Sequence, residues 1–124
     1  MLVHILNRFL GSSNSDRFKA DSEASYERSR ANDFEQRAAQ HLHDSHSSHV
    51  EDHETRNAMW YYLRAALRGD QEAQYKMGLS YLNGQLGLDR NYSQAEKWLA
   101  QAAHQGHLQA KEELNKAYNN LAFS

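Results

Sequence analysis

Apolar residues in the second half of the chain recur with the spacing of amphipathic helices, and this pattern occurs twice. When the stretch from Ala58 to Tyr118 is shifted by 37 positions, it aligns with itself. Small residues fall on small residues, aromatic residues on aromatic residues, and Gly69 on Gly106. A fixed period of about 20 to 50 residues is typical of stacked repeats, which bury their apolar faces against their neighbours. The pattern therefore predicts an all-α fold.

Four helices are expected in this part, over residues 56–67, 71–83, 92–105 and 108–121. Gly69, Gly84 and Gly106 follow the first three helices, where a glycine commonly ends a helix. Asp70 precedes the second helix and is a favoured N-cap residue. We expect the following residues to be the structural positions of the repeat: Ala58, Tyr61, Ala65, Ala66, Gly69, Ala73, Gly78, Tyr81, Gly84, Ala95, Trp98, Ala102, Ala103, Gly106 and Ala110.

Two pairs of alanines in this pattern indicate how the helices pack. The pairs Ala65-Ala66 and Ala102-Ala103 have side chains small enough for a neighbouring helix to approach closely. An aromatic residue four positions earlier, Tyr61 or Trp98, can fill the space beside each pair. We therefore expect antiparallel helix pairs stacked at a constant offset.

The N-terminus contains a second kind of apolar pattern. Its apolar residues form one broad stripe on a short helix, which Gly11 is placed to end. The stripe consists of Leu2, Val3, Ile5, Leu6, Phe9 and Leu10. So short a helix is unstable alone in water, so the stripe must dock on its own domain, on a second copy of the chain or on a partner. We name Leu2, Leu6 and Phe9 as candidate contact residues and expect that this helix could mediate homo-oligomerisation.

Between these parts the chain is polar. Residues 11–16 are rich in serine and asparagine and predict a joint, and residues 17–42 predict a helix whose apolar positions are sparse. Those positions are Phe18, Tyr26, Phe34, Ala38 and Leu42. We therefore divide the chain into an N-terminal helix with its joint (1–16), a polar helix with a histidine-rich connector (17–54) and a helical repeat domain (55–124).

The histidine-rich connector spans residues 41–53. If it is helical, His46, His49 and His53 share one face, which is a spacing that metal ligands adopt. One helix face seldom supplies the three or four donors that zinc requires. Two interpretations stay open: a polar connector whose histidines face water, and a metal-binding or pH-sensing segment.

Composition narrows the function classes. The formal net charge of −2 provides no basic field for nucleic acid, so we expect no nucleic-acid partner. No cysteine is present, which excludes disulfides, thiolate metal sites and a cysteine nucleophile.

The apolar run at the N-terminus lacks a basic start and is too short to span a bilayer, so we expect a cytoplasmic protein without membrane contact. We find no catalytic motif such as Gly-x-Ser-x-Gly, a phosphate-binding glycine loop or His-Glu-x-x-His, so we expect no enzyme and no cofactor.

The repeat resembles a known unit. The pattern reads Ala73-x4-Gly78-x2-Tyr81-x2-Gly84, then Gly87-Leu88, then Ala95-x2-Trp98-x3-Ala102-Ala103-x2-Gly106-x3-Ala110. It looks like a Sel-one-like repeat, a relative of the tetratricopeptide repeat, over about half of the chain. Five features depart from the family pattern. They are one extra residue between Gly84 and Gly87, Asn91 in place of an aspartate, Gln94 in place of a lysine, Asn115 in place of the helix glycine, and the lack of a closing glycine after Tyr118.

The resemblance implies a short right-handed α-solenoid of antiparallel helix pairs with additional N-terminal helices. It also implies a non-catalytic module that binds another protein, as an adaptor, a scaffold or a regulatory subunit of a bacterial complex. Two helix pairs are fewer than such a stack normally needs, so the N-terminal helices or a second chain should cover it. We expect the partner to contact exposed positions of the inner helices. These are Tyr75, Lys76, Leu79, Glu112, Glu113 and Lys116; alternatively, they cover the joint with the N-terminal helices.

Overall fold

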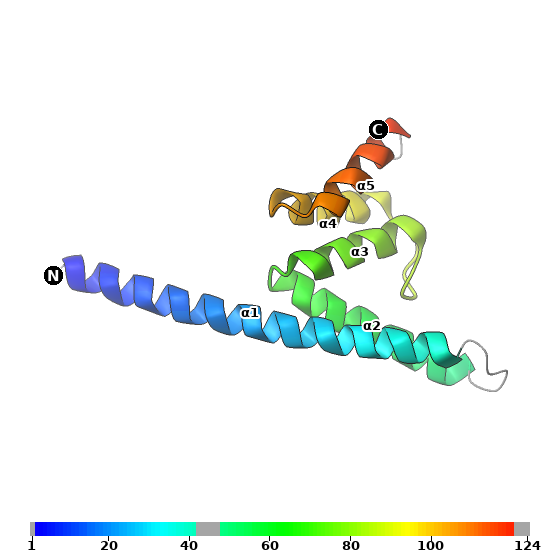
Figure 1. Ribbon diagram of the computed structural model, residues 1–124, viewed down its shortest axis with the longest axis horizontal. Coiled ribbons are helices and arrows are strands. Elements are labelled where there is room, and N and C mark those ends of the chain that lie inside the picture. The colour runs from blue at the N-terminus through cyan, green and yellow to red at the C-terminus, as the bar shows by residue number, and fades with distance from the viewer. Residues whose placement is uncertain (1, 42–47, 121–124) are drawn as a thin grey trace.

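The computed structural model describes residues 2–41 and 48–120, with side chains described for residues 18–40 and 52–120. This part of the chain consists of helices joined by turns, and it contains no strand. The helices are α1 (Leu2–His41), α2 (Ser48–Leu67), α3 (Gln71–Asn83), α4 (Tyr92–His104) and α5 (Leu108–Asn119). Each helix packs against the next along the chain, which gives a stack of antiparallel neighbours (Figure 1). The predicted all-α repeat fold is confirmed.

Helix α1 differs from the prediction for the N-terminus. We expected Gly11 to end a first helix and residues 11–16 to form a joint, but α1 runs without a break for 40 residues. A glycine in the interior of a helix costs only about 1 kcal/mol, and no proline is present to interrupt the backbone hydrogen bonds. The beginning of α1 therefore continues past the C-terminal end of α2, away from the other helices (Figure 1).

The contact between α1 and α2 rests on small residues. Ala24, Ala31 and Ala38 are buried and stand seven positions apart, so they share one side of α1. Of the sparse apolar positions expected on this helix, Phe18 and Tyr26 are 78% and 63% exposed, whereas Phe34 packs against the core cluster. The close approach of α2 favours alanine at these three positions of α1.

Identical chain reversals occur 37 residues apart. After α2, the N–H of Gly69 bonds to the carbonyl of Ala66, and the N–H of Asp70 bonds to that of Ala65. After α4, Gly106 and His107 bond in the same way to Ala103 and Ala102. Both glycines adopt a φ of 98°, which side chains rarely tolerate. The sequence repeat is therefore also a repeat of backbone geometry.

Gly78 sets the distance between α3 and α4. A Cβ atom at this position would lie 2.6 Å from Cγ of the fully buried Leu99 on α4. That distance is below van der Waals contact, so only glycine allows the observed packing. Leu99 belongs to a core cluster with Ala102, Ala103 and Ala110. A second cluster joins α1, α2 and α3 to Trp98 of α4, and it also includes Ala31, Ala58, Ala65, Ala73 and Met77.

The connection from α3 to α4 holds the extra residue noted in the sequence. Gly84 ends α3 in the left-handed conformation, and Leu86 also adopts a positive φ, of 55°. The side chain of Leu86 packs against the core cluster of α1, α2 and α3. The left-handed backbone of a leucine costs roughly 1–2 kcal/mol, which this burial offsets.

Candidate interaction surface

Residues predicted to bind a partner lie on two neighbouring helices, α3 and α5. Tyr75 and Leu79 are half-buried on α3, and Glu112 and Lys116 are exposed on α5. Leu79 stands 200° around the helix from the fully buried Met77 at ideal geometry, that is, nearly opposite to the core. We call this set, together with Lys76 and Glu113, the α3–α5 face.

Tyr75 is fixed within this face by the turn before α5. Its ring stacks on that of His107, with ring centroids 4.4 Å apart and an angle of 30° between the planes. Partial burial raises the pKa of Tyr75, and the negative charges of Glu113, Glu72 and Glu112 raise it further. The tyrosine therefore stays neutral and presents a rigid edge between α3 and α5.

Lys76 links the α3–α5 face to α1. Its Nζ forms an ion pair with Glu35 and lies 5.6 Å from the centre of the Tyr62 ring. The Tyr62 hydroxyl lies 2.7 Å from carboxylate oxygen Oε2 of Glu35 and 2.7 Å from Oδ1 of Asn32. Burial and the hydrogen bond to Glu35 raise the pKa of Tyr62 well above its usual range. Lys76 thus contributes to the contact between α3 and α1. Such a contact with the N-terminal helices was one of the two predicted roles for these positions.

Two hollows flank the face. One, of about 340 Å³, lies between α1 and α3 and is lined by Asn32, Glu35, Gln36, Ala39 and Lys76. The other, also of about 340 Å³, lies between α3, α5 and the connection before α4. Its lining includes Leu82, Arg90, Tyr92, Glu113 and Lys116. Lys76, one turn before Leu79 on α3, lines the first hollow, and Leu82, one turn after it, lines the second; both hollows contain both signs of charge.

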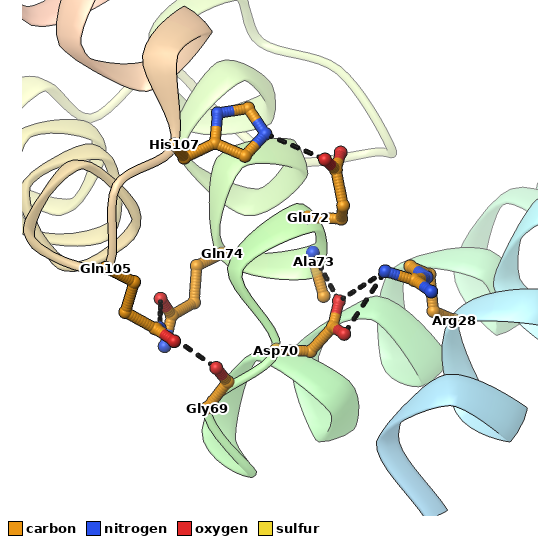
Figure 2. Close-up of polar contacts among 8 residues, drawn as sticks. All are labelled: Arg28, Gly69, Asp70, Glu72, Ala73, Gln74, Gln105 and His107. Atoms are coloured by element: carbon orange, nitrogen blue, oxygen red, sulfur yellow. Dashed lines mark hydrogen bonds and ion pairs between the residues drawn. The ribbon is translucent and has the colours of Figure 1, made fainter. Parts of the chain in front are cut away.

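The N-caps of α3 and α5 hold these helices in register. The Asp70 carboxylate accepts a hydrogen bond of 2.9 Å from the N–H of Ala73 and forms an ion pair of 3.2 Å with Arg28 of α1 (Figure 2). In the equivalent position 37 residues later, Nδ1 of His107 accepts from the N–H of Ala110. Its Nε2 therefore carries the proton and donates to Glu72 over 3.0 Å (Figure 2).

Glutamines join the two chain reversals between these caps. Nε2 of Gln105 donates to the carbonyl of Gly69 and to Oε1 of the buried Gln74, over 2.9 and 2.7 Å (Figure 2). Nε2 of Gln74 donates in turn to the carbonyl of Ala66 over 3.2 Å. The end of α4 is thereby tied to the end of α2, so α3 and α5 keep a fixed spacing.

The predicted metal candidates are not brought together by the described structure. His46 lies outside the described residues, the side chain of His49 is not described, and His53 is exposed on α2. Within residues that the structure describes, no group of three or more histidine, cysteine, aspartate or glutamate side chains could hold a metal ion. The metal-binding alternative is therefore without support.

Leu2, Leu6 and Phe9 lie on the part of α1 whose side chains are not described. Their helical backbone is shared with the rest of α1, so the stripe that the sequence predicts belongs to a longer helix than expected. None of the helices, over the residues described, is long and apolar enough to cross a membrane.

One charged feature was missed by the sequence analysis. Arg30 and Arg37 of α1 lie over the ring of Phe34, and Arg64 of α2 lies over that of Tyr61. The only signal in the sequence is the spacing of Arg30, Phe34 and Arg37, which places them on one side of a helix. The contribution of α2 required the pairing of the two helices to be known.

Comparison with known families agrees with this geometry. The family model of the Sel1 repeat matches residues 52–70 and 71–107. The second match contains α3, α4 and the two turns that follow them, and the first covers most of α2. No curated protein and no solved structure gives a significant match to the chain.

Proposed function

Because this chain is a Sel1-like repeat protein of the tetratricopeptide-like helical superfamily, we propose that it acts as an adaptor or scaffold that binds another protein through the α3–α5 face. Sel1 repeats generally mediate interactions between proteins and are typically non-catalytic. The observation that carries this proposal is the position of Leu79. It is a half-buried apolar side chain on α3, and Lys76 and Leu82, one turn before and after it, each line one of the two hollows.

The face suits a protein partner of mixed charge. Glu112 and Lys116 are exposed beside the half-buried Tyr75 and Leu79. An aromatic or aliphatic anchor surrounded by a polar rim is the usual arrangement of an interface hot spot. A role in a bacterial complex in the cytoplasm stays a prediction of the sequence.

Affinity capture from the extract of the source cell tests the proposal. The bait is the full chain, and its matched variants are Leu79→Glu with Lys116→Glu and, as a control, Ala100→Glu with Lys97→Glu on the exposed side of α4. A partner captured by the wild type and by the α4 control, and lost with the α3–α5 variant, supports the proposal. The same partner captured equally by both variants would contradict it.

Homo-oligomerisation through the beginning of α1 is a separate proposal. This part of α1 extends past α2 (Figure 1), and the sequence places Leu2, Leu6 and Phe9 on it. Deleting residues 1–11 should lower the mass measured by sedimentation equilibrium if these residues join two copies. An unchanged mass, with unchanged helicity by circular dichroism, would refute this role.

A further inference from the structure

A stacked pair of aromatic rings lies at the contact between α1 and α2, surrounded by three arginines. The centroids of Phe34 and Tyr61 are 5.6 Å apart, and their planes differ by 14°. The guanidinium carbon of Arg30 lies 5.1 Å from the centroid of Phe34 and 5.9 Å from that of Tyr61. Arg37 lies 5.4 Å from the Phe34 centroid, and Arg64 lies 5.6 Å from that of Tyr61. We call these five residues the arginine–aromatic cluster.

The cluster has an excess of positive charge. Among the side chains that the structure describes, Arg28 and Arg68 each form ion pairs with carboxylates, whereas Arg30, Arg37 and Arg64 form none. Two carboxylates lie one turn from these arginines on α1: Asp33, beside Arg30 and Arg37, and Glu27, which already binds Arg68. The cluster itself therefore carries three positive charges and no carboxylate, on a chain whose formal net charge is −2.

Arg30 shows that this charge is only partly compensated. Its Nε atom is buried and has no hydrogen-bond partner among the residues that the structure describes. The aromatic faces hold the guanidinium groups by cation–π attraction, which leaves the N–H edge of a stacked arginine available for a carboxylate. Arg37 and Arg64 are exposed, so a carboxylate from another molecule can reach them.

A hollow beside the cluster adds an apolar element. It has a volume of about 350 Å³ and is lined by Asn57, Trp60, Tyr61 and Arg64. The Trp60 side chain, an aromatic residue that is common at interface hot spots, is 50% exposed. A ligand that fits this surface combines negative charges with at least one apolar side chain.

We infer that the arginine–aromatic cluster is a docking site for an acidic segment of a partner protein, whose carboxylates bind the guanidinium groups while an apolar side chain enters the hollow. Carboxylates match the planar fork of arginine in two parallel hydrogen bonds. A nucleic acid gains its affinity from many phosphate contacts, and three arginines on an acidic chain supply few. The site shares no residue with the α3–α5 face. This inference therefore goes beyond the proposed function and is tested independently of it.

Fluorescence anisotropy with purified full-length protein tests this inference. The probe is a short fluorescein-labelled peptide rich in glutamate and containing leucine, compared with the same peptide carrying glutamine in place of glutamate. The test variant is Arg37→Gln with Arg64→Gln, which keeps the half-buried Arg30 in place. Its matched control is Lys19→Gln with Lys111→Gln, which removes two exposed positive charges from other parts of the surface. Circular dichroism and thermal melting establish that each variant is folded.

We expect saturable binding of the acidic peptide that weakens as salt is added, because the contacts are ionic. The Arg37/Arg64 variant should bind at least about tenfold more weakly, since each charge-assisted hydrogen bond contributes on this order. The Lys19/Lys111 control and the Leu79→Glu variant should stay within about twofold of the wild type, as expected for charges far from the site.

Three results of the peptide measurements would overturn the inference. They are the absence of saturable binding by the wild type, equal affinity of the Arg37/Arg64 variant, and equal binding of the glutamine peptide. Single-stranded RNA and phosphatidylserine vesicles serve as competing probes. If either binds more tightly than the acidic peptide and depends on the same arginines, the surface does not recognise a protein segment.

Discussion

The repeat and the N-terminal helix are held by different kinds of contact. Between α3 and α4, Gly78 lies directly against Leu99, and the cluster around Leu99 is apolar. Between α1 and the helices that follow, alanines form the buried seam, and ion pairs flank it. The stability of the repeat should therefore depend on shape, whereas the attachment of α1 should depend also on charge.

Ion pairs surround the attachment of α1 on both sides. Arg28 binds Asp70, and Glu35 binds Lys76 of α3. On the other side, Arg68 of α2 binds both Glu23 and Glu27, and the hydrogen bond to Glu27 raises the pKa of Arg68. Such partly exposed pairs each contribute little to stability and weaken with salt. The comparison between the two regions leads to four predictions, in order of decreasing effect.

The largest effect should come from Leu99→Ala in the repeat. Leu99 is fully buried, and its truncation leaves a cavity, so the free energy of unfolding should fall by about 2–5 kcal/mol. The matched control is Leu67→Ala at the end of α2, where the side chain is 69% exposed, and it should change stability by less than about 0.5 kcal/mol. Urea denaturation followed by circular dichroism measures both. Similar losses for the two variants would show that α3 and α4 do not form the core.

Gly78→Ala should destabilise the repeat by about 1–3 kcal/mol, because the added methyl group would collide with Leu99. The matched control is Asn115→Ala, 37 residues later on the exposed side of α5, where alanine should be neutral or slightly stabilising. Thermal melting distinguishes the two. Helix propensity alone would raise the free energy of unfolding of Gly78→Ala by about 1 kcal/mol. An increase of that size would contradict the close packing of α3 against α4.

Removing an N-cap residue should lower the free energy of unfolding more where that residue also forms an ion pair with α1. Asp70→Ala removes both the N-cap of α3 and the ion pair with Arg28, so it should destabilise by about 1–3 kcal/mol. Asn91→Ala removes only the exposed N-cap of α4 and should cost about 0.5–1 kcal/mol. The difference should shrink in molar sodium chloride and when Arg28→Ala is already present. A difference that is independent of salt and of Arg28 would argue against a role for the ion pair.

The smallest effect should be a change in the pH dependence of stability at Tyr62. Burial and the bond to Glu35 raise its pKa in the folded protein above the usual value of 10.0. The stabilisation by neutral Tyr62 is therefore complete below pH 10 and is lost as the pH rises above that value, because the unfolded chain ionises first.

Tyr62→Phe has no phenol to ionise, so its stability should fall less steeply above pH 10 than that of the wild type. The half-buried Tyr75, whose pKa is also raised, leaves a residual slope in the variant. Tyr26→Phe, at a position that is 63% exposed, is the control for the removal of a tyrosine hydroxyl and should follow the wild type. Urea unfolding on either side of pH 10 measures these slopes, and parallel curves for wild type and Tyr62→Phe would refute the assignment.

Some features of the fold were visible in the sequence because they depend on local rules. Glycines at the ends of α2 and α4 and the 37-residue period determine the chain reversals, and both are properties of single segments. The continuation of α1 through Gly11 was missed, because a glycine can end a helix or be tolerated within it, and only the context decides. Of the buried seam on α1, Ala38 was among the expected apolar positions, but Ala24 and Ala31 were not, although they stand fourteen and seven residues before it.

The candidate surfaces depend on contacts between helices, which one segment cannot reveal. The role of Lys76 became clear only with Glu35 on α1, and that of His107 only with Glu72 on α3. A cap role for His107 could have been inferred from the 37-residue shift, which places it on Asp70. The arginine–aromatic cluster combines residues about 30 positions apart, so no periodicity within a helix predicts it.

The most direct test of the α3–α5 face as the partner surface is site-specific photo-cross-linking in the source cell. A photoreactive amino acid replaces Leu79 in one variant and the exposed Ala100 of α4 in the other. The account predicts a discrete cross-linked product with another protein from position 79 and none from position 100. The same product from both positions, or a product from position 100 alone, would contradict it.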